Sequence, residues 1–294
     1  MLNVAFLGLG SIGRPMAKRI KEAGFPLTVW NRTANRATTF AKEIGAATAK
    51  TAADAARGAD VVVTCLSTSL DVEQVVDSGL IAGLKAGSVL LDCTSGDPAT
   101  SKRIAARLLE KKVAFIDAPV SGGVKGAIEG TLTVMCGGAL ADLDRVRPVI
   151  DAFGKKIVHC GPVGAGVAVK AMNQALLALT IWGTGEALVA LAKSGVSPHV
   201  ALEVINASSG RSNASMNLVP ERVLTRAFPR TFRLALMDKD VRIAAQIARD
   251  EKVPAPLTQL VADLCTLAHQ ELGAEADHVE SVQVIERWAA AQIK

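Results

Sequence analysis

Lys170 stands in the apolar segment 167–172, and two amide side chains follow it at helical spacing. A buried ammonium group is costly unless it has a partner or a role. Asn173 and Gln174 come three and four residues later, so the three side chains share one face of a helix. One ammonium and two amides placed in this way could polarise a carbonyl group and donate a proton to it. The alternative is a lysine that reaches solvent from the helix end, and the pattern leaves both interpretations open.

A glycine pattern near the start of the chain predicts a dinucleotide site. Gly8, Gly10 and Gly13 have the spacing Gly-x-Gly-x-x-Gly, directly after the apolar run 4–7 and before a helical segment. We expect Gly8 to permit the turn, Gly10 to let the backbone approach a pyrophosphate and Gly13 to let helix pack on strand. The amino end of that helix would attract the phosphates. The alternative is an ordinary glycine-rich turn. The expected cofactor-binding residues here are Gly8, Leu9, Gly10, Ser11 and Ile12.

The residues after the second expected strand indicate which cofactor is bound. NAD sites usually carry Asp or Glu at this point, to bind the ribose 2′-hydroxyl group. Here the residue is Asn31, followed by Arg32 and Thr33, with Arg36 one turn later. A guanidinium can pair with a 2′-phosphate, which an acid would repel. The sequence therefore predicts a preference for NADP. If Arg32 is simply a solvated residue, NAD is also accepted.

Three further segments carry polar residues after expected strands. The loops 65–69 and 92–96, which include Leu66, Thr94 and Ser95, should close over the cofactor, because ligands of open α/β sheets bind at the carboxyl edge. The turn 117–123 exposes backbone N–H groups and the Ser121 hydroxyl, which together suit a carboxylate. As a turn alone it is equally an ordinary loop. Asp97 has no role that the sequence suggests.

Alternating apolar runs and helical patterns predict the fold of the first half. Continuous apolar runs are typical of strands that are covered on both faces, and the alternation predicts a doubly wound, mostly parallel sheet of the Rossmann type. The last strands should run antiparallel, because 127–138 leaves little room for a crossover helix. The expected strands are 3–7, 27–31, 61–66, 88–92, 113–117, 131–137 and 156–160, and the expected helices are 14–23, 34–43, 98–110 and 139–152.

The pattern changes near residue 162. Residues 167–193 contain no proline and predict a buried helix of about 40 Å. The rest is helical, with breaks expected at Pro198, Pro220, Pro229, Pro254 and Pro256. We therefore expect a dinucleotide-binding domain over 1–162 and an all-helical domain over 163–294 that begins with this long interdomain helix. The apolar content of the second domain suggests a homo-oligomer, a dimer or a tetramer.

Composition excludes several other classes of protein. The chain has 294 residues and a net charge of +5, with no basic run and no tyrosine, which gives a nucleic-acid role little support. No uninterrupted apolar run reaches the roughly 18 residues of a membrane span, and no signal peptide is expected. The five cysteines have no Cys-x-x-Cys spacing and the four histidines no ligand spacing, so we expect buried thiols in a reducing, cytoplasmic compartment and no metal.

These motifs, in this order, resemble the β-hydroxyacid dehydrogenases, which include 3-hydroxyisobutyrate dehydrogenase and tartronate semialdehyde reductase. The resemblance covers essentially the whole chain. The matching elements are the glycine turn 8–17, the segment 117–123, Gly164-x-Gly166-x-x-x-Lys170-x-x-Asn173, and Lys239-Asp240. It implies an NAD(P)-dependent oxidoreductase that transfers hydride between the nicotinamide and a small 3-hydroxy acid or semialdehyde carboxylate.

The resemblance also implies a role for each matching residue. Lys170 would be the general acid in reduction and the general base in oxidation. Ser121, Gly122 and Gly123 would hold the substrate carboxylate, and Asn173 and Gln174 would orient Lys170 or the substrate. Thr94 and Ser95 would lie by the nicotinamide ribose. Phe232, Lys239 and Asp240 would cover the nicotinamide, although the Lys239–Asp240 pair alone reads more readily as a surface ion pair.

One departure bears on the substrate. Several members of the family have Asn-Asn after the catalytic lysine, whereas this chain has Asn173-Gln174, which looks more like the tartronate semialdehyde reductase and threonate dehydrogenase branches. Tartronate semialdehyde is therefore the first expected substrate, methylmalonate semialdehyde the second, and glyoxylate or succinic semialdehyde the third. 6-Phosphogluconate dehydrogenase would need a longer helical domain, and imine reductases usually lack the lysine. A non-catalytic NADP-binding sensor would not need Lys170, Ser121 and Lys239 together.

Overall fold

The computed structural model describes residues 1–293, and the chain divides into two compact units, Met1–Lys170 and a second that begins at Ala171. The division lies inside one long helix, α9 (Ala165–Lys193). The sequence-based boundary at residue 162 marks where the helical part begins, whereas the first turns of α9 belong to the first unit. Lys170 is the last residue of that unit.

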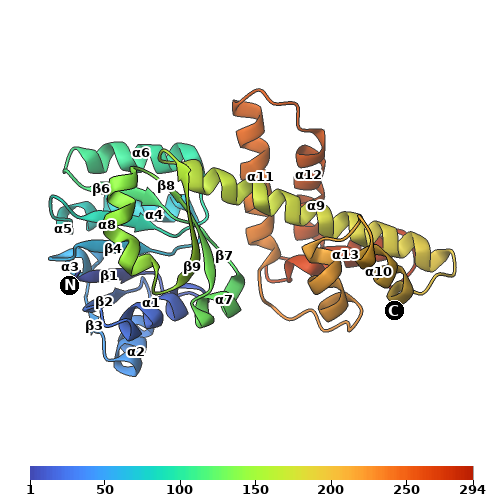
Figure 1. Ribbon diagram of the computed structural model, residues 1–294, viewed down its shortest axis with the longest axis horizontal. Helices are drawn as coiled ribbons and strands as arrows, with labels where there is room; N and C mark the ends of the chain where they lie inside the picture. Colours follow the sequence, from blue (N-terminus) through green and yellow to red (C-terminus); the bar gives the residue numbers. More distant parts are fainter. Residues whose placement is uncertain (294) are drawn as a thin grey trace. The chain divides into compact units, whose positions relative to one another are not determined.

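The first unit is built on a nine-stranded sheet (Figure 1). The strand order is β3-β2-β1-β4-β5-β6-β8-β7, with β9 paired to β8. The strands from β3 to β6 are parallel, β8 runs antiparallel to both β6 and β7, and β9 is parallel to β8. The mostly parallel Rossmann-type sheet is therefore confirmed, with the antiparallel change expected near its end. The strands are β1 (Val4–Leu7), β2 (Leu27–Trp30), β3 (Ala47–Thr48), β4 (Val61–Thr64), β5 (Val89–Asp92), β6 (Ala114–Asp117), β7 (Val120–Ser121), β8 (Leu132–Gly137) and β9 (Gly154–Gly161).

Helices cover both faces of this sheet. Successive strand residues point to opposite faces, so Val4 and Phe6 pack under one helical layer and Ala5 and Leu7 under the other. The first layer holds α1 (Gly13–Glu22), α2 (Ala34–Ile44), α7 (Gly123–Glu129) and α8 (Leu140–Ile150). The second holds α3 (Ala52–Ala56), α4 (Ser69–Val75), η1 (Val76–Leu80) and α6 (Pro98–Leu109), with the short α5 (Ile81–Gly83) beside α3 and η1.

The second unit consists of helices, as expected. Its core is a cluster of small and branched apolar side chains, including Ala178, Val241 and Cys265. Pro198 and Pro256 occupy first turns, where the missing N–H group costs nothing. The break expected at Pro220 is wrong, because this proline lies inside the π-helical segment η2. The elements after α9 are α10 (Pro198–Ala207), η2 (Ala214–Val223), α11 (Leu234–Asp250), α12 (Pro256–Leu272), η3 (His278–Ser281) and α13 (Val282–Trp288).

Helix α9 corrects one expectation drawn from composition. Within residues 1–293, it is the one helix long and apolar enough to cross a membrane, although no uninterrupted apolar run had suggested this. By length and composition, the core helix of a soluble protein passes the same test. Buried α9 residues such as Ala178 and Ile181 belong to the core of the second unit, so the helix is at least in part a core helix.

Candidate active site

The glycine turn lies at the carboxyl edge of the sheet, between β1 and α1. Gly8 has φ +105°, and a Cβ there would lie 2.3 Å from the Cys65 carbonyl oxygen. A Cβ on Gly13 would lie 2.0 Å from the Gly8 carbonyl oxygen. A Cβ on Gly10 would meet no described atom within 4 Å. The turn itself therefore requires Gly8 and Gly13, whereas Gly10 borders open space where a ligand can approach the backbone.

The amino end of α1 suits an anion. Its first turn contains no acidic residue, and the N-cap residue, Ile12, makes no side-chain capping hydrogen bond. Ser11 and Gly10 are exposed beside it. The turn and this helix end together fit the pyrophosphate of a dinucleotide, because N–H groups of the first turn and the helix dipole both favour negative charge.

Asn31 has a structural task that the sequence analysis missed. Its Oδ1 accepts a hydrogen bond from the Leu9 N–H at 3.0 Å, and its Nδ2 donates to the Thr33 carbonyl oxygen at 3.2 Å. The side chain thus holds the glycine turn against the end of β2. Arg32 and Arg36 are exposed beside it, and within residues 1–293 neither side chain forms an ion pair with a carboxylate. Two cations therefore remain available to an anionic group at this edge.

The two loops expected to close over the cofactor are joined to each other. The Leu66 N–H donates to Thr94 Oγ1 at 3.0 Å, and the Thr94 N–H donates to Asp92 Oδ1 at 3.0 Å. Thr94 is buried, whereas Leu66 and Ser95 are half-buried. The Thr94 side chain therefore holds the loop that contains Leu66, and both Leu66 and Ser95 are more accessible than Thr94 itself.

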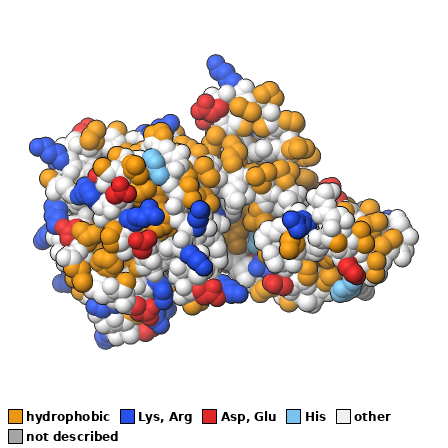
Figure 2. Space-filling view, viewed as in Figure 1, with side chains coloured by type: hydrophobic (Ala, Val, Ile, Leu, Met, Phe, Trp, Pro, Cys, Tyr) orange, Lys and Arg blue, Asp and Glu red, His pale blue; other side chains and the backbone are white. Residues whose placement is uncertain are grey.

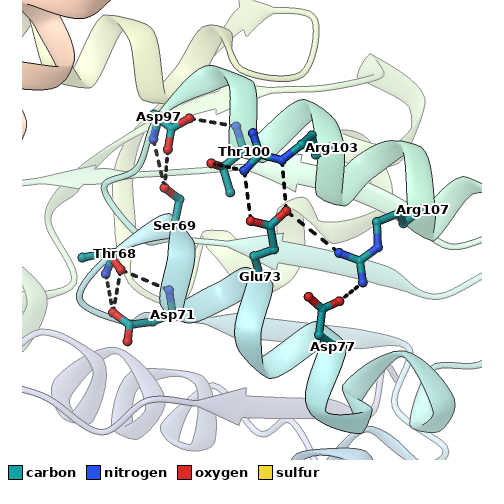
Figure 3. A network of polar contacts seen from close by, with 9 residues as sticks. All are labelled: Thr68, Ser69, Asp71, Glu73, Asp77, Asp97, Thr100, Arg103 and Arg107. Carbon is teal, nitrogen blue, oxygen red and sulfur yellow. Dashed lines mark hydrogen bonds and ion pairs between the residues drawn. The ribbon is translucent and has the colours of Figure 1, made fainter.

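Asp97, for which the sequence suggested no role, links the same two loops by hydrogen bonds (Figure 3). The Ser69 hydroxyl donates to Asp97 Oδ2 at 2.6 Å, and the Thr100 N–H donates to Asp97 Oδ1 at 2.8 Å, so Asp97 also caps α6. Burial alone would raise the pKa of Asp97, but these hydrogen bonds hold it below its usual value. Further along, Arg103 of α6 pairs with Glu73 of α4 through two nitrogens. The two loops and the helices that follow them form one connected assembly.

Asp92 is a buried carboxylate at the centre of this edge. It is 1% exposed, and its Oδ1 accepts from the Thr64 hydroxyl at 2.8 Å as well as from the Thr94 N–H. Burial raises the pKa of Asp92 to about 6, against the hydrogen bonds from Thr94 and Thr64. Burial likewise raises the pKa of the neighbouring Cys65 thiol to about 12, so this thiol is a weak nucleophile.

We predict that Asp92→Asn flattens part of the pH dependence of stability. The folded-state pKa is raised above the unfolded value, so the stability contributed by protonated Asp92 is lost as pH rises through about 6. An asparagine oxygen can accept the same two hydrogen bonds without charge. The variant should therefore gain up to about 3 kcal/mol over the parent protein between about pH 4 and pH 7. Urea unfolding across this range measures the gain, with Asp144→Asn, at an exposed position, as control. A difference in unfolding free energy between Asp92→Asn and the parent protein that stays constant with pH would refute the prediction.

The segment expected to hold a carboxylate begins at the end of β6. Ser121 is half-buried on β7 and pairs with Thr133 of β8, and Gly122 and Gly123 follow with φ +131° and +64° at the start of α7. Both glycines are exposed. The positive φ values explain why glycine stands at both positions.

Lys170 and Gln174 are both buried on the same face of α9, at 7% and 4% exposure. Asn173 lies on the same helix but is exposed. The structure therefore supports grouping Lys170 with Gln174 and sets Asn173 towards a neighbouring face. The interpretation of Lys170 as a lysine that reaches solvent does not fit its burial.

The remaining expected residues belong to the second unit. Phe232 precedes α11, and its N–H donates to Asp277 Oδ2 at 3.1 Å, which also accepts from the Thr231 N–H at 2.9 Å. Burial would raise the pKa of Asp277, but His278 and these N–H groups hold it well below its ordinary range. Lys239 pairs with Asp240 at 3.1 Å, and Asp240 is 3% exposed, so the pair is not on the helix surface.

Two family models together match nearly the whole chain. The NAD binding domain of 6-phosphogluconate dehydrogenase matches residues 3–161, and the NAD-binding domain of NADP-dependent 3-hydroxyisobutyrate dehydrogenase matches residues 164–285. The two matches meet at the start of α9.

Curated relatives and solved structures agree with these matches. The chain is 36% identical to a 3-hydroxyisobutyrate dehydrogenase of Pseudomonas aeruginosa, over 95% of both chains. It is 35% identical to an NAD-dependent L-serine dehydrogenase of the same species, over 94% of this chain and 95% of that one. A structure of Mycobacterium tuberculosis 3-hydroxyisobutyrate dehydrogenase with L-serine shares the fold with a TM-score of 0.91 and 31% identity, covering 97% of this chain and 99% of that chain.

Proposed function

The chain belongs to the β-hydroxyacid dehydrogenase family and is an NAD(P)-dependent hydroxyacid dehydrogenase acting on CH–OH groups, and we propose that it works with NADP(H) as a tartronate semialdehyde reductase. The observation that carries the proposal is the burial of Lys170 on α9, a helix whose first turn is bonded to the residue that opens the 117–123 segment. The end of β6 thus leads into the turn proposed to bind the carboxylate. The same strand end also anchors α9, the helix that carries Lys170.

Each group would have a simple task. The nicotinamide supplies the hydride. Ser121 and the N–H groups at Gly122 and Gly123 bind the substrate carboxylate. The Lys170 ammonium donates its proton to the carbonyl oxygen as the alcohol forms, and Gln174, one turn later on the same buried face, orients it. In the oxidative direction neutral Lys170 accepts the same proton. From the second unit, Phe232, Lys239 and Asp240 are proposed to contact the nicotinamide.

NADP is the proposed cofactor, with NAD as a slower alternative. Two observations support it: within residues 1–293 neither Arg32 nor Arg36 forms an ion pair with a carboxylate, and the residue after β2 is Asn31 and not an acid. The description of the second matching domain, that of an NADP-dependent enzyme, points the same way. A relative described as NAD-dependent keeps NAD among the cofactors to be tested.

The substrate class follows from chemistry that the relatives' substrates share. 3-Hydroxyisobutyrate and L-serine, named in two relatives, both carry a primary alcohol on the carbon next to the one that bears the carboxylate. Tartronate semialdehyde reduction gives an alcohol of the same kind, with a hydroxyl group on the central carbon. Methylmalonate semialdehyde, the oxidised partner of 3-hydroxyisobutyrate, is the second candidate, and glyoxylate or succinic semialdehyde the third.

A substrate panel tests this ranking. We expect kcat/KM with NADPH to be highest for tartronate semialdehyde, because Gln174 offers an amide to its extra hydroxyl group. Methylmalonate semialdehyde, succinic semialdehyde, glyoxylate and, for oxidation, L-serine complete the panel. In Gln174→Asn the advantage of tartronate semialdehyde over methylmalonate semialdehyde should fall about tenfold, the equivalent of one hydrogen bond. Faster turnover of methylmalonate semialdehyde or L-serine by the parent protein would show that its preferred substrate is not tartronate semialdehyde.

The proposal includes a homo-oligomer, a dimer or a tetramer, in the cytoplasm. Large apolar side chains are exposed along the helical unit, among them Leu176, Val204 and Leu257. Hydrophobic side chains also lie over much of the part formed by α11 and α12 (Figure 2). A second copy of the chain would cover such a surface.

All five cysteines are free thiols, which suits a reducing compartment. No nucleic-acid, membrane or metal partner is part of the proposal.

A further inference from the structure

Asp117, the last residue of β6, is a fully buried carboxylate bonded to the beginning of α9. Its Oδ1 accepts a hydrogen bond from the Gly164 N–H at 2.7 Å, and its Oδ2 accepts one from the Val167 N–H at 2.9 Å. Its side chain has 0% exposure. Both oxygens are therefore used on backbone groups at the first turn of one helix, which is the N-capping arrangement supplied from a distant strand.

Two glycines are needed to let the carboxylate reach these positions. A Cβ on Gly166 would lie 2.2 Å from the Met135 carbonyl oxygen and 2.8 Å from Asp117 Oδ2. A Cβ on Gly137, in β8, would lie 2.6 Å from Asp117 Oδ1. The helix start, β8 and β6 thus close tightly around one side chain. This packing gives a physical reason for the second glycine of the Gly164-x-Gly166 pattern.

The charge of Asp117 is balanced by the helix. Burial raises its pKa, and the N–H groups of Gly164 and Val167 act in the opposite direction because they hydrogen-bond the charged form. The positive end of the α9 dipole faces the same carboxylate. Loss of the negative charge, or of one acceptor, would therefore weaken the attachment of the first turn.

We propose that Asp117 is a positioning residue for Lys170, and that this carboxylate fixes the first turn of α9 so that the ammonium group is aligned with the substrate held by Ser121, Gly122 and Gly123. The proposal rests on the proposed function, in which Lys170 is the proton donor. Val167, held by Oδ2, is three residues before Lys170, so a shift of the first turn moves the lysine directly. The backbone that continues from Asp117 leads to Ser121. Asp117 therefore helps to position both the proposed proton donor and the residues proposed to bind the substrate.

Asp117→Asn tests the proposal by steady-state kinetics. An amide has one acceptor, and its NH₂ group would face an N–H donor, so one of the two bonds to α9 is lost. We expect kcat to fall about 10- to 100-fold, because small displacements of a catalytic group cost this much. The Kd for NADPH, measured by fluorescence, should stay within about twofold, since the Gly8–Gly13 turn is untouched. Unchanged kcat in a folded Asp117→Asn protein would overturn the proposal.

A double-mutant cycle separates positioning from a purely structural role. If Asp117 acts through Lys170, the substitution Asp117→Asn should have no further effect on kcat in a Lys170→Ala protein. If the two losses multiply, Asp117 does not act through Lys170 and the proposal is wrong. Undiminished turnover of Lys170→Ala alone would instead remove the proposed function, and with it the role of Asp117. The two failures are therefore distinguishable.

A control and a second variant complete the test. Glu286 is another buried carboxylate that accepts a backbone N–H, from Ile293 at 2.8 Å, and it belongs to none of the proposed binding groups. Glu286→Gln should lower the unfolding temperature while leaving kcat unchanged. Where Asp117→Asn does not fold, Gly166→Ala keeps the charge but pushes the helix start away from the carboxylate. It should show the same loss of kcat, again absent in the Lys170→Ala background, and a normal kcat would refute the proposal.

Discussion

Replacing Lys170 with alanine is expected to lower kcat about 10²- to 10⁴-fold, with little change in the Kd for NADPH. The physical reason is that a positioned general acid contributes this much to a step in which a proton is delivered to the carbonyl oxygen. Lys170 is 7% exposed, so water cannot readily take its place. Initial rates with saturating NADPH and semialdehyde, together with a direct NADPH binding measurement, give both quantities.

Two controls make the Lys170 result specific. Lys170→Arg keeps a positive charge, but a guanidinium does not release its proton near neutral pH, so this variant should stay impaired. Lys193→Ala removes an exposed lysine from the other end of α9, where it donates to the Ala289 carbonyl oxygen, and should turn over normally. Added primary amines should restore part of the activity of Lys170→Ala but none to Lys170→Arg. A fully active Lys170→Ala protein would eliminate the proposed mechanism.

Replacing Arg32 with alanine is expected to raise the KM for NADPH about 10- to 100-fold and to leave the KM for NADH nearly unchanged. A hydrogen-bonded charge pair is worth about 1.5–3 kcal/mol, and each 1.4 kcal/mol is a factor of ten in affinity. Arg32 is exposed at the end of β2, and within residues 1–293 it forms no ion pair with a carboxylate, so it has no competing partner to lose. Parallel titrations with the two cofactors measure the preference.

The matched control for Arg32 is Arg57→Ala. Arg57 is also exposed and follows α3, but it precedes β4 and so lies at the opposite edge of the sheet, where it pairs with Asp54. Its replacement should change neither KM. If Arg32→Ala weakens NADH and NADPH equally, Arg32 supports the fold of the turn and does not read the 2′-phosphate.

Much of the fold could be predicted because its signals are local. The strand β4 is a continuous apolar run, and β1 runs directly into the glycine turn, so periodicity and turn chemistry place both. The helices α3, before β4, and α4 and α5, after it, were missed, because each is short and a π-helical stretch separates α4 from α5. The break expected at Pro220 is absent, since a π-helical segment accommodates this proline.

The candidate site was predictable in its motifs but not in the contacts that hold them. Asn31 bonds to Leu9, Ser69 to Asp97, and Asp117 to the start of α9, and in each case the partners lie far apart in the chain. No local pattern reports such a pair. One signal was nonetheless present: a buried or half-buried polar residue must find a partner, and Asn31, Asp97 and Asp117 each stand at the end of a strand or in the loop that follows it.

The most direct test of the central claim follows hydride into the product. NADPH carrying deuterium at the transferring position is incubated with the protein and tartronate semialdehyde, and the product is analysed by mass spectrometry and NMR. We predict glycerate with one deuterium on the carbon of the new primary alcohol, formed at a much lower rate by Lys170→Ala. Glycerate without the label, or no product despite tight NADPH binding, would contradict the account.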